Sequence, residues 1–179
     1  MELKDTTLTR FQFFSELKRG RKFESEVQEE IGKITFGKIF NNVQIDHMEF
    51  DAIIADYPLM TFVEIKAYRS NFRRREIKKA LIKLVRNCVT ITEDQTLCYK
   101  DWVPHKEKWG TTGNRKWLLQ KLGIEILEGW QFRMVFIIPD KSFIPVMSAI
   151  EGKRLSSNLL DIDGFPLLVI PKRRIKEVF

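Results

Sequence analysis

Two apolar segments flank the turn residues Asp56-Tyr57-Pro58 and restrict the fold more than any other feature of the sequence. One runs from residue 43 or 48 to residue 55, and the other covers residues 59–67. Both are rich in the β-branched and aromatic residues that favour strands. The residues between them are typical of a tight turn. We therefore expect an antiparallel hairpin, which excludes a sheet with only parallel strands.

Helical patterns lie on both sides of this hairpin. Apolar residues recur at helical spacing over residues 8–34, and Gly20 is expected to divide this segment into two helices. An alternating strand pattern over residues 34–40 then ends at Asn41-Asn42, which is a turn signal. After the hairpin, residues 72–89 carry the clearest helical stripe in the chain. The stripe consists of Ile77, Ala80, Leu81, Leu84, Val85 and Cys88.

The second half of the chain adds further strands and a short helix. Residues 130–138 predict a strong strand, residues 143–150 a helix and residues 166–170 another strand, whereas residues 93–129 are harder to interpret. This order of elements predicts an α/β fold with a central mixed β-sheet flanked by helices. The length of 179 residues and the hydrophobic fraction of 44% match a single domain over residues 1–179.

Positive charge is concentrated in one region of the sequence. The net charge is +7, and residues 66–86 hold nine positive residues against one negative, so the rest of the chain is nearly neutral. Such a local excess favours nucleic acid as a partner. The residues expected to contact it are Arg69, Arg73, Arg74, Lys78 and Lys79. The alternative is that this charged face of the helix is simply solvated.

The composition also indicates in which cellular compartment the protein is expected. No segment approaches the roughly 18 unbroken apolar residues of a membrane span. The N-terminal residues 1–10 mix both charges and lack the apolar region of a secretory signal. The two cysteines, Cys88 and Cys98, are too few for a disulfide framework or a zinc site with four cysteines. We therefore expect a cytoplasmic protein with reduced thiols that does not contact a membrane.

Three charged residues lie inside the apolar strands. Glu64 and Lys66 are two apart and share a strand face, and a modest register of the hairpin brings Asp51 beside Glu64. A buried carboxylate is strongly unfavourable unless it is paired or binds a metal ion. Two adjacent carboxylates therefore predict a divalent cation, and oxygen ligands suit Mg²⁺ or Mn²⁺. The alternative is an ordinary surface ion pair between Glu64 and Lys66.

These residues carry a resemblance to a known family. Asp51, twelve intervening residues and Glu64-Ile65-Lys66 resemble the D…ExK signature of the PD-(D/E)xK nuclease superfamily. Upstream, Gly20 and Glu24 are similar to the GxxxE helix of the archaeal Holliday junction resolvases. One departure is Phe50, which stands where the name-giving proline would be.

The resemblance implies a site and a fold. Glu24, Asp51 and Glu64 would bind the metal ion, and Lys66 would be the catalytic lysine. Glu24 borders the apolar face of its helix, and Glu26 is its rival if the helix is rotated. The fold would be the restriction-endonuclease-like core of a helix, a three-strand meander, a helix and a strand. This core would cover residues 20–139, with residues 140–179 as a C-terminal extension.

The function that follows is a divalent-metal-dependent endonuclease that hydrolyses phosphodiester bonds in duplex or branched DNA. Many members of the superfamily act as dimers, so a homodimer is expected. Two alternatives within the superfamily stay open, a catalytically inactive nucleic-acid-binding module and an endonuclease that cleaves RNA. A protein-interaction domain that binds neither metal nor nucleic acid is a third. A neighbouring metal ion and the basic helix would lower the pKa of Lys66, and the adjacent carboxylates would raise it.

Overall fold

A mixed β-sheet forms the centre of the chain, as a computed structural model shows for residues 10–45, 48–68, 74–93, 120, 122–124, 129–151, 161–162 and 165–179. The sheet has the strand order β1-β2-β3-β4-β6-β5. The first three strands form an antiparallel meander, and β4 and β6 run parallel to β3. The strands are β1 (Lys38–Ile45), β2 (Met48–Asp56), β3 (Leu59–Ile65), β4 (Gln131–Ile138), β5 (Asp161–Ile162) and β6 (Phe165–Pro171).

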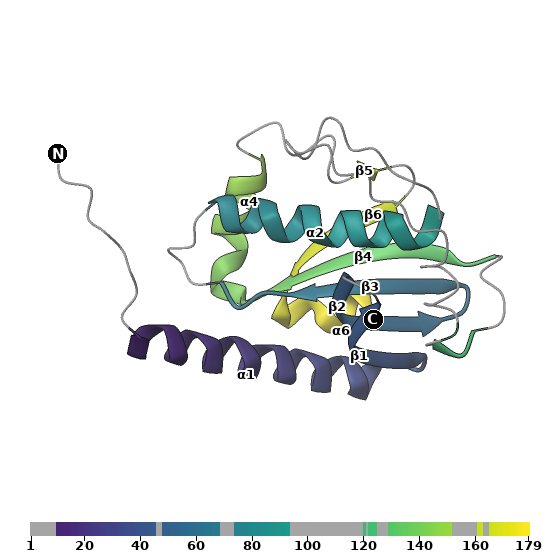
Figure 1. Ribbon diagram of the computed structural model, residues 1–179, viewed down its shortest axis with the longest axis horizontal. Coiled ribbons are helices and arrows are strands. Elements are labelled where there is room, and N and C mark those ends of the chain that lie inside the picture. Colours follow the sequence, from purple (N-terminus) through teal and green to yellow (C-terminus); the bar gives the residue numbers. More distant parts are fainter. Residues whose placement is uncertain are drawn as a thin grey trace.

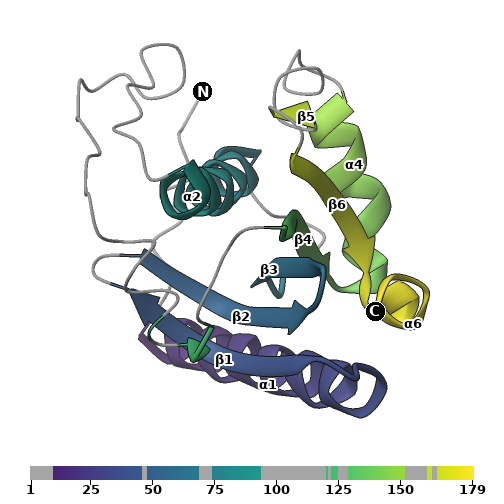
Figure 2. The same cartoon turned by 90° about the vertical axis from the view of Figure 1, so that its right-hand side faces the viewer.

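Helices cover both faces of this sheet. The α-helices are α1 (Arg10–Ile34), α2 (Arg74–Glu93), α4 (Phe143–Glu151) and α6 (Ile175–Val178), and two short 3-10 helices are η1 (Asp140–Ser142) and η2 (Lys172–Arg174). Figures 1 and 2 show α2 and α4 on one side of the sheet and α1 and α6 on the other. The predicted α/β class with a mixed sheet is therefore confirmed. None of the helices in the described segments is long and apolar enough to span a membrane.

Each face of the sheet has its own hydrophobic core. The larger core packs α2 and α4 against the sheet, and Phe50, Phe62 and Phe136 are its largest fully buried side chains. The predicted stripe of α2 belongs to this core, because all six of its residues are buried. The smaller core packs α1 and α6 against the opposite face and includes Val27 and Ile31. Burial on both faces explains why the central strands are almost continuously apolar.

Two of the predictions for the N-terminal region are wrong. Gly20 does not divide the first helix, because α1 is continuous over 25 residues. A helix-interior glycine is unfavourable by only about 1 kcal/mol relative to alanine, which is too little to end a helix of this length. The strand does not end at Asn41-Asn42 but continues through both residues to Ile45. At Asn42 the strand has a left-handed backbone, with φ 52°, which asparagine tolerates better than most residues.

Candidate functional site

The alternation of side chains between the two faces of the sheet is interrupted once in β1 and β2. This interruption positions the first carboxylate, that of Asp51. Along β2, Phe50 and Ile53 point into the larger core, whereas Ala52 points into the smaller one. The alternation therefore shifts by one residue at Asp51. Paired residues on either side place Asn42 opposite Asp51, and Asn42 is the residue with the left-handed backbone. The irregularity thus frees Asp51 from the regular ladder.

Asp51 is held by two hydrogen bonds that replace those of the ladder. The backbone N–H of Ile65 donates to Asp51 Oδ2 at 2.5 Å. The side-chain amide of Gln28, on α1, donates to the Asp51 carbonyl oxygen at 2.8 Å. The register of β2 and β3, in which Ala52 pairs with Val63, places Asp51 opposite Glu64. The carboxylate is therefore fixed at the end of β3, next to the second acid.

Glu64 is a buried carboxylate with little compensation. Its side chain is 1% exposed, and neither Oε1 nor Oε2 accepts a hydrogen bond of good geometry from the residues that the structure describes. Its close contact is an ion pair, because the Lys66 ammonium lies 2.6 Å from Oε1. Burial, followed by the negative charge of Asp51, raises the pKa of Glu64 above its ordinary value. Oε2 has no donor among the described residues, and a buried acceptor of this kind is expected to have a ligand that they do not supply.

Lys66 bridges the two carboxylates. Its ammonium lies 3.5 Å from Asp51 Oδ2 and donates a hydrogen bond of 3.3 Å to the Ile65 carbonyl oxygen. Burial lowers the pKa of Lys66, but the Glu64 and Asp51 carboxylates outweigh it, so the pKa is raised. One ammonium faces two carboxylates, which explains why Lys66 stays protonated while the ionised form of Glu64 is still disfavoured.

Glu24 approaches this group from α1. Its pKa is raised by burial and then by the negative charge of Asp51, so it lies within electrostatic reach of the two strands. Gln28, one helical turn later, donates a 3.4 Å hydrogen bond to Glu24 Oε1. The rival Glu26 points elsewhere, since it pairs with Lys172 at 2.8 Å and with Lys22 at 3.9 Å. Helical geometry therefore favours Glu24 over Glu26 as the third acid.

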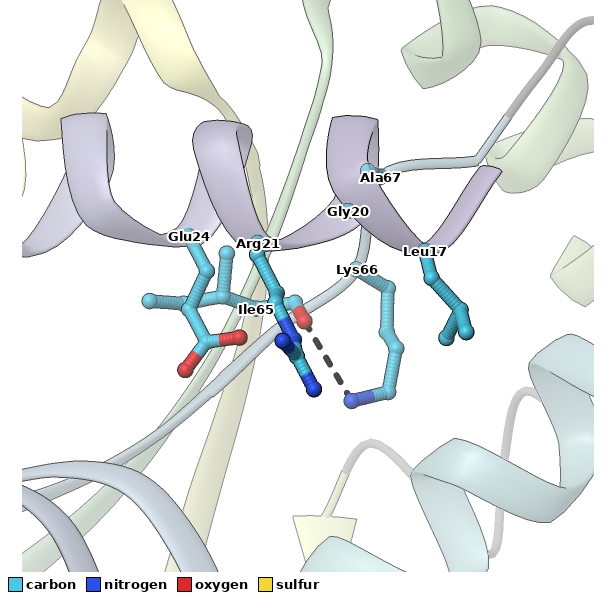
Figure 3. A pocket seen from close by; sticks show the side chains of 7 residues that line it. All are labelled: Leu17, Gly20, Arg21, Glu24, Ile65, Lys66 and Ala67. Atoms are coloured by element: carbon cyan, nitrogen blue, oxygen red, sulfur yellow. Dashed lines mark hydrogen bonds between the residues drawn. The ribbon is translucent and has the colours of Figure 1, made fainter. Parts of the chain in front are cut away.

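A pocket of about 340 Å³ separates α1 from the end of β3. Figure 3 shows Glu24 and Arg21 on the helix side and Lys66 on the strand side. The full lining is Leu17, Gly20, Arg21, Glu24, Ile65, Lys66 and Ala67. The predicted catalytic lysine, Lys66, and the two residues of the predicted GxxxE motif, Gly20 and Glu24, therefore line the same pocket.

The donor set fits a divalent cation in part. Both Glu64 oxygens are buried, with the Lys66 ammonium against Oε1 and no hydrogen bond to Oε2 from the described residues, and the Asp51 carboxylate lies beside them at the end of β3. Oxygen donors of this kind suit Mg²⁺ or Mn²⁺. Within the described segments, no three histidine, cysteine, aspartate or glutamate side chains are close enough together to form a ready-made metal site. Asp51, Glu64 and Lys66 thus converge, and Glu24 lies near them without completing a three-ligand cluster.

The residues predicted to contact nucleic acid are placed only in part. Lys78 and Lys79 are exposed on α2, away from its buried stripe. Arg74 begins α2, and its side chain is not described. Arg69 and Arg73 lie outside the described residues. The exposed lysines are compatible with the predicted phosphate-contacting face.

Sequence reasoning missed two residues of this site. Gln28 links Glu24 to Asp51, and Arg21 lines the pocket. Their spacing from Glu24, four residues after and three before, places all three on one face of the helix. That spacing was an available signal, but it shows the shared face only once one knows which side of α1 faces the sheet.

The chain was compared with protein-family models, with curated proteins and with solved structures. None of the three comparisons finds a match.

Proposed function

We propose that this chain is a divalent-metal-dependent endonuclease that hydrolyses phosphodiester bonds in DNA. The observation that carries the proposal is Glu64, a carboxylate with 1% exposure for which the described residues supply the Lys66 ammonium, 2.6 Å from Oε1, and no hydrogen bond to Oε2. It lies opposite Asp51 and two residues before Lys66, as in the D…ExK signature. An ordinary structural ion pair would place its carboxylate at the surface or surround it with donors.

The order of elements supports the same proposal. A helix, an antiparallel meander of three strands, a second helix and a strand parallel to β3 follow one another from α1 to β4. The restriction-endonuclease-like core that the resemblance implies has its elements in the same order, which supports the proposal. The exposed Lys78 and Lys79 on α2 favour a polyanionic substrate.

Asp51 and Glu64 would hold the cation, with Glu24 as the additional ligand from α1. When bound, such an ion polarises the scissile phosphate and lowers the pKa of the attacking water. The chain itself keeps the two acids in place, because Ile65 and Gln28 fix Asp51 and the core fixes Glu64. Lys66 orients the water or stabilises the charge that develops on the phosphate.

A substrate panel tests the function. Labelled duplex, flap, four-way junction, single-stranded DNA and RNA would each be incubated with Mg²⁺, Mn²⁺ or EDTA. We expect cleavage of at least one DNA substrate with metal and none with EDTA. Glu64→Gln should abolish that cleavage, and Glu26→Gln should preserve it, because Glu26 pairs with Lys172 on the surface. Cleavage of RNA alone would replace DNA as the substrate, and equal activity of both variants would reject the site.

A catalytically inactive nucleic-acid-binding module is the second candidate. It is favoured by the Lys66 ammonium, which already neutralises part of the acid pair, and by the lack of a three-ligand cluster in the described segments. Such a module would bind DNA equally with and without metal.

The nuclease is expected to act as a homodimer in the cytoplasm, and sedimentation with and without DNA would test the dimer.

A further inference from the structure

The packing of the described residues does not explain why a glycine, Gly20, stands in the middle of α1. It has no left-handed backbone, and a Cβ added there would meet no atom within 4 Å. No close approach by any described residue therefore requires glycine at this position. A glycine inside a helix is unfavourable relative to alanine because it loses more conformational freedom on folding. The reason for the glycine must be sought outside the packing.

The pocket beside Lys66 supplies that reason. Leu17, Gly20, Arg21 and Glu24 form one stripe along α1, with the spacing of neighbours on a helix, and all four line the pocket. At Gly20 the wall is bare helix backbone. A side chain here would extend toward the pocket, whereas its absence lets a ligand approach the helix closely.

The chemistry of the lining is divided between charge and apolar surface. The side chains of Arg21 and Lys66 both reach into the space between the helix and the strand end (Figure 3). Leu17 and Ala67 provide apolar surface, and Leu17 remains 43% exposed. A volume of about 340 Å³ falls within the range of sites for small organic ligands. Two of the three charged side chains in the lining are positive, and the third is the Glu24 carboxylate, so the pocket suits a compact molecule with an anionic end beside Arg21 and Lys66 and an apolar body.

The surroundings favour one unit of a longer anionic chain over a free metabolite. Lys18, Arg19 and Lys22 are exposed next to Arg21 on the same helix. These four positive side chains within five residues continue the anion-attracting surface beyond the pocket. A backbone that carries phosphates at regular intervals can meet both the pocket and this surface.

We propose that this pocket binds one nucleotide of the nucleic-acid strand, next to the phosphate that is cleaved. Arg21 and Lys66 bind a phosphate of that nucleotide, its sugar packs against Leu17, and Gly20 leaves the room for it. The assignment rests on the proposed function, since it takes the substrate to be a nucleic acid.

Binding of fluorescein-labelled hexathymidylate, measured by fluorescence anisotropy in EDTA, tests the subsite without any cleavage. Gly20→Leu fills the pocket and should weaken binding at least tenfold. Gly32→Leu is the matched control, because Gly32 lies in the same helix, has equally open space and does not line the pocket. It should leave binding within twofold of the wild type. Circular dichroism would show whether both variants keep their helix.

A second pair keeps the proposal testable if a leucine variant fails to fold. Arg21→Gln and Lys22→Gln each remove one exposed positive charge, but only Arg21 lines the pocket. Arg21→Gln should weaken binding about tenfold, as expected for the loss of a charge-assisted hydrogen bond, and Lys22→Gln at most about threefold. Equal losses within either pair would overturn the subsite, as would a wild type that does not bind the probe.

Cleavage assays on the same variants distinguish an error in the proposed subsite from an error in the proposed nuclease function. If the wild type cleaves DNA with metal and Gly20→Leu cleaves and binds like Gly32→Leu, the subsite is wrong and the nuclease stands. If the wild type never cleaves but the two variant pairs still differ in binding, the nuclease is wrong and the nucleotide subsite stands.

Discussion

The two long helices of this chain carry similar exposed charges but are used in different ways. α2 buries six apolar residues in a continuous stripe against the sheet. Among the described side chains of α1, only Val27 and Ile31 are fully buried, and both lie in its second half. The first half of α1 projects past the end of the sheet (Figure 1). It is there that Gly20, Arg21 and Glu24 line the pocket.

The difference shows which helix residues are determined by packing and which are available for function. Burying a large apolar side chain stabilises the fold by about 1.5–3 kcal/mol, so a stripe like that of α2 is enough to fix a helix in place. In the first half of α1, none of the side chains at residues 15 and 17–22 is buried, so these positions are free to serve a ligand. The following predictions test this contrast, from the largest expected effect to the smallest.

The largest effect concerns Lys66, which faces the first half of α1 across the pocket at the end of β3. If Lys66 positions the attacking water with its ammonium, Lys66→Ala and Lys66→Arg should both lower the cleavage rate by about a hundredfold or more. Arginine should fail because its planar guanidinium has a different shape from the compact ammonium. Single-turnover cleavage and Mn²⁺ binding would be measured, with binding retained in both variants. Near-normal activity of Lys66→Ala would mean that the ExK match is accidental.

Stability separates the helices directly. Leu84→Ala on α2 removes a side chain that is 1% exposed and should lower the free energy of unfolding by about 2–5 kcal/mol. Leu17→Ala on α1 removes one that is 43% exposed and should change it by at most about 0.5 kcal/mol. Urea unfolding of the two variants would show this difference. Similar losses would mean that the first half of α1 is part of the core.

How far the sequence predicts the molecule differs between the same two regions. The stripe of α2 and the hairpin of β2 and β3 depend on local periodicity, so they are predicted correctly. The hairpin also brings Asp51 beside Glu64 in the expected register. The pairing of Gln28 with Asp51, and the pocket between α1 and β3, depend on how a distant helix crosses the sheet. Local spacing contains no information about that crossing.

The change of side-chain alternation at Asn42 and Asp51 shows the same limit. Asparagine pairs are usual in turns, so Asn41-Asn42 predicts one. Here the strand continues because its partner β2 is irregular at the opposite residue, and Gln28 binds the Asp51 carbonyl that the ladder leaves free. Whether the strand continues at Asn41-Asn42 thus depends on α1, β1 and β2 together. It cannot be predicted from the sequence of any one of these segments.

The positive charges at the start of α2 should act on binding rather than on stability. Neutralising Arg74, Lys78 and Lys79 together should weaken binding to all DNA sequences alike. It should flatten the dependence of log affinity on log salt by up to about 0.9 for each phosphate that the protein no longer neutralises. Lys33→Gln is the control, since Lys33 pairs with Glu29 at 2.6 Å. An unchanged slope in the triple variant would show that this face is only solvated.

The smallest effect is a gain in stability on α1. Gly20→Ala should raise the free energy of unfolding by about 0.5–1 kcal/mol, because alanine fits the open space and restricts the unfolded chain. Gly32→Ala should behave alike, since its surroundings are equally open. Thermal unfolding would compare the two variants. A loss of stability for Gly20→Ala would reveal a packing role for the glycine and remove the argument for a functional one.

The central claim is that Asp51 and Glu64 are held together to bind a divalent cation. Thermal unfolding of the wild type and of Glu64→Gln at pH 8, each in EDTA and in Mn²⁺, tests it most directly. Because burial and Asp51 raise the pKa of Glu64, its charge destabilises the metal-free fold, and that penalty develops as the pH rises from the ordinary pKa to the raised one and is complete above it. The variant should therefore unfold at the same or a higher temperature than the wild type in EDTA. Mn²⁺ should raise the unfolding temperature of the wild type and leave that of the variant unchanged. A variant that is less stable in EDTA, together with a wild type that does not respond to Mn²⁺, would contradict the claim and leave Glu64 and Lys66 as a structural ion pair.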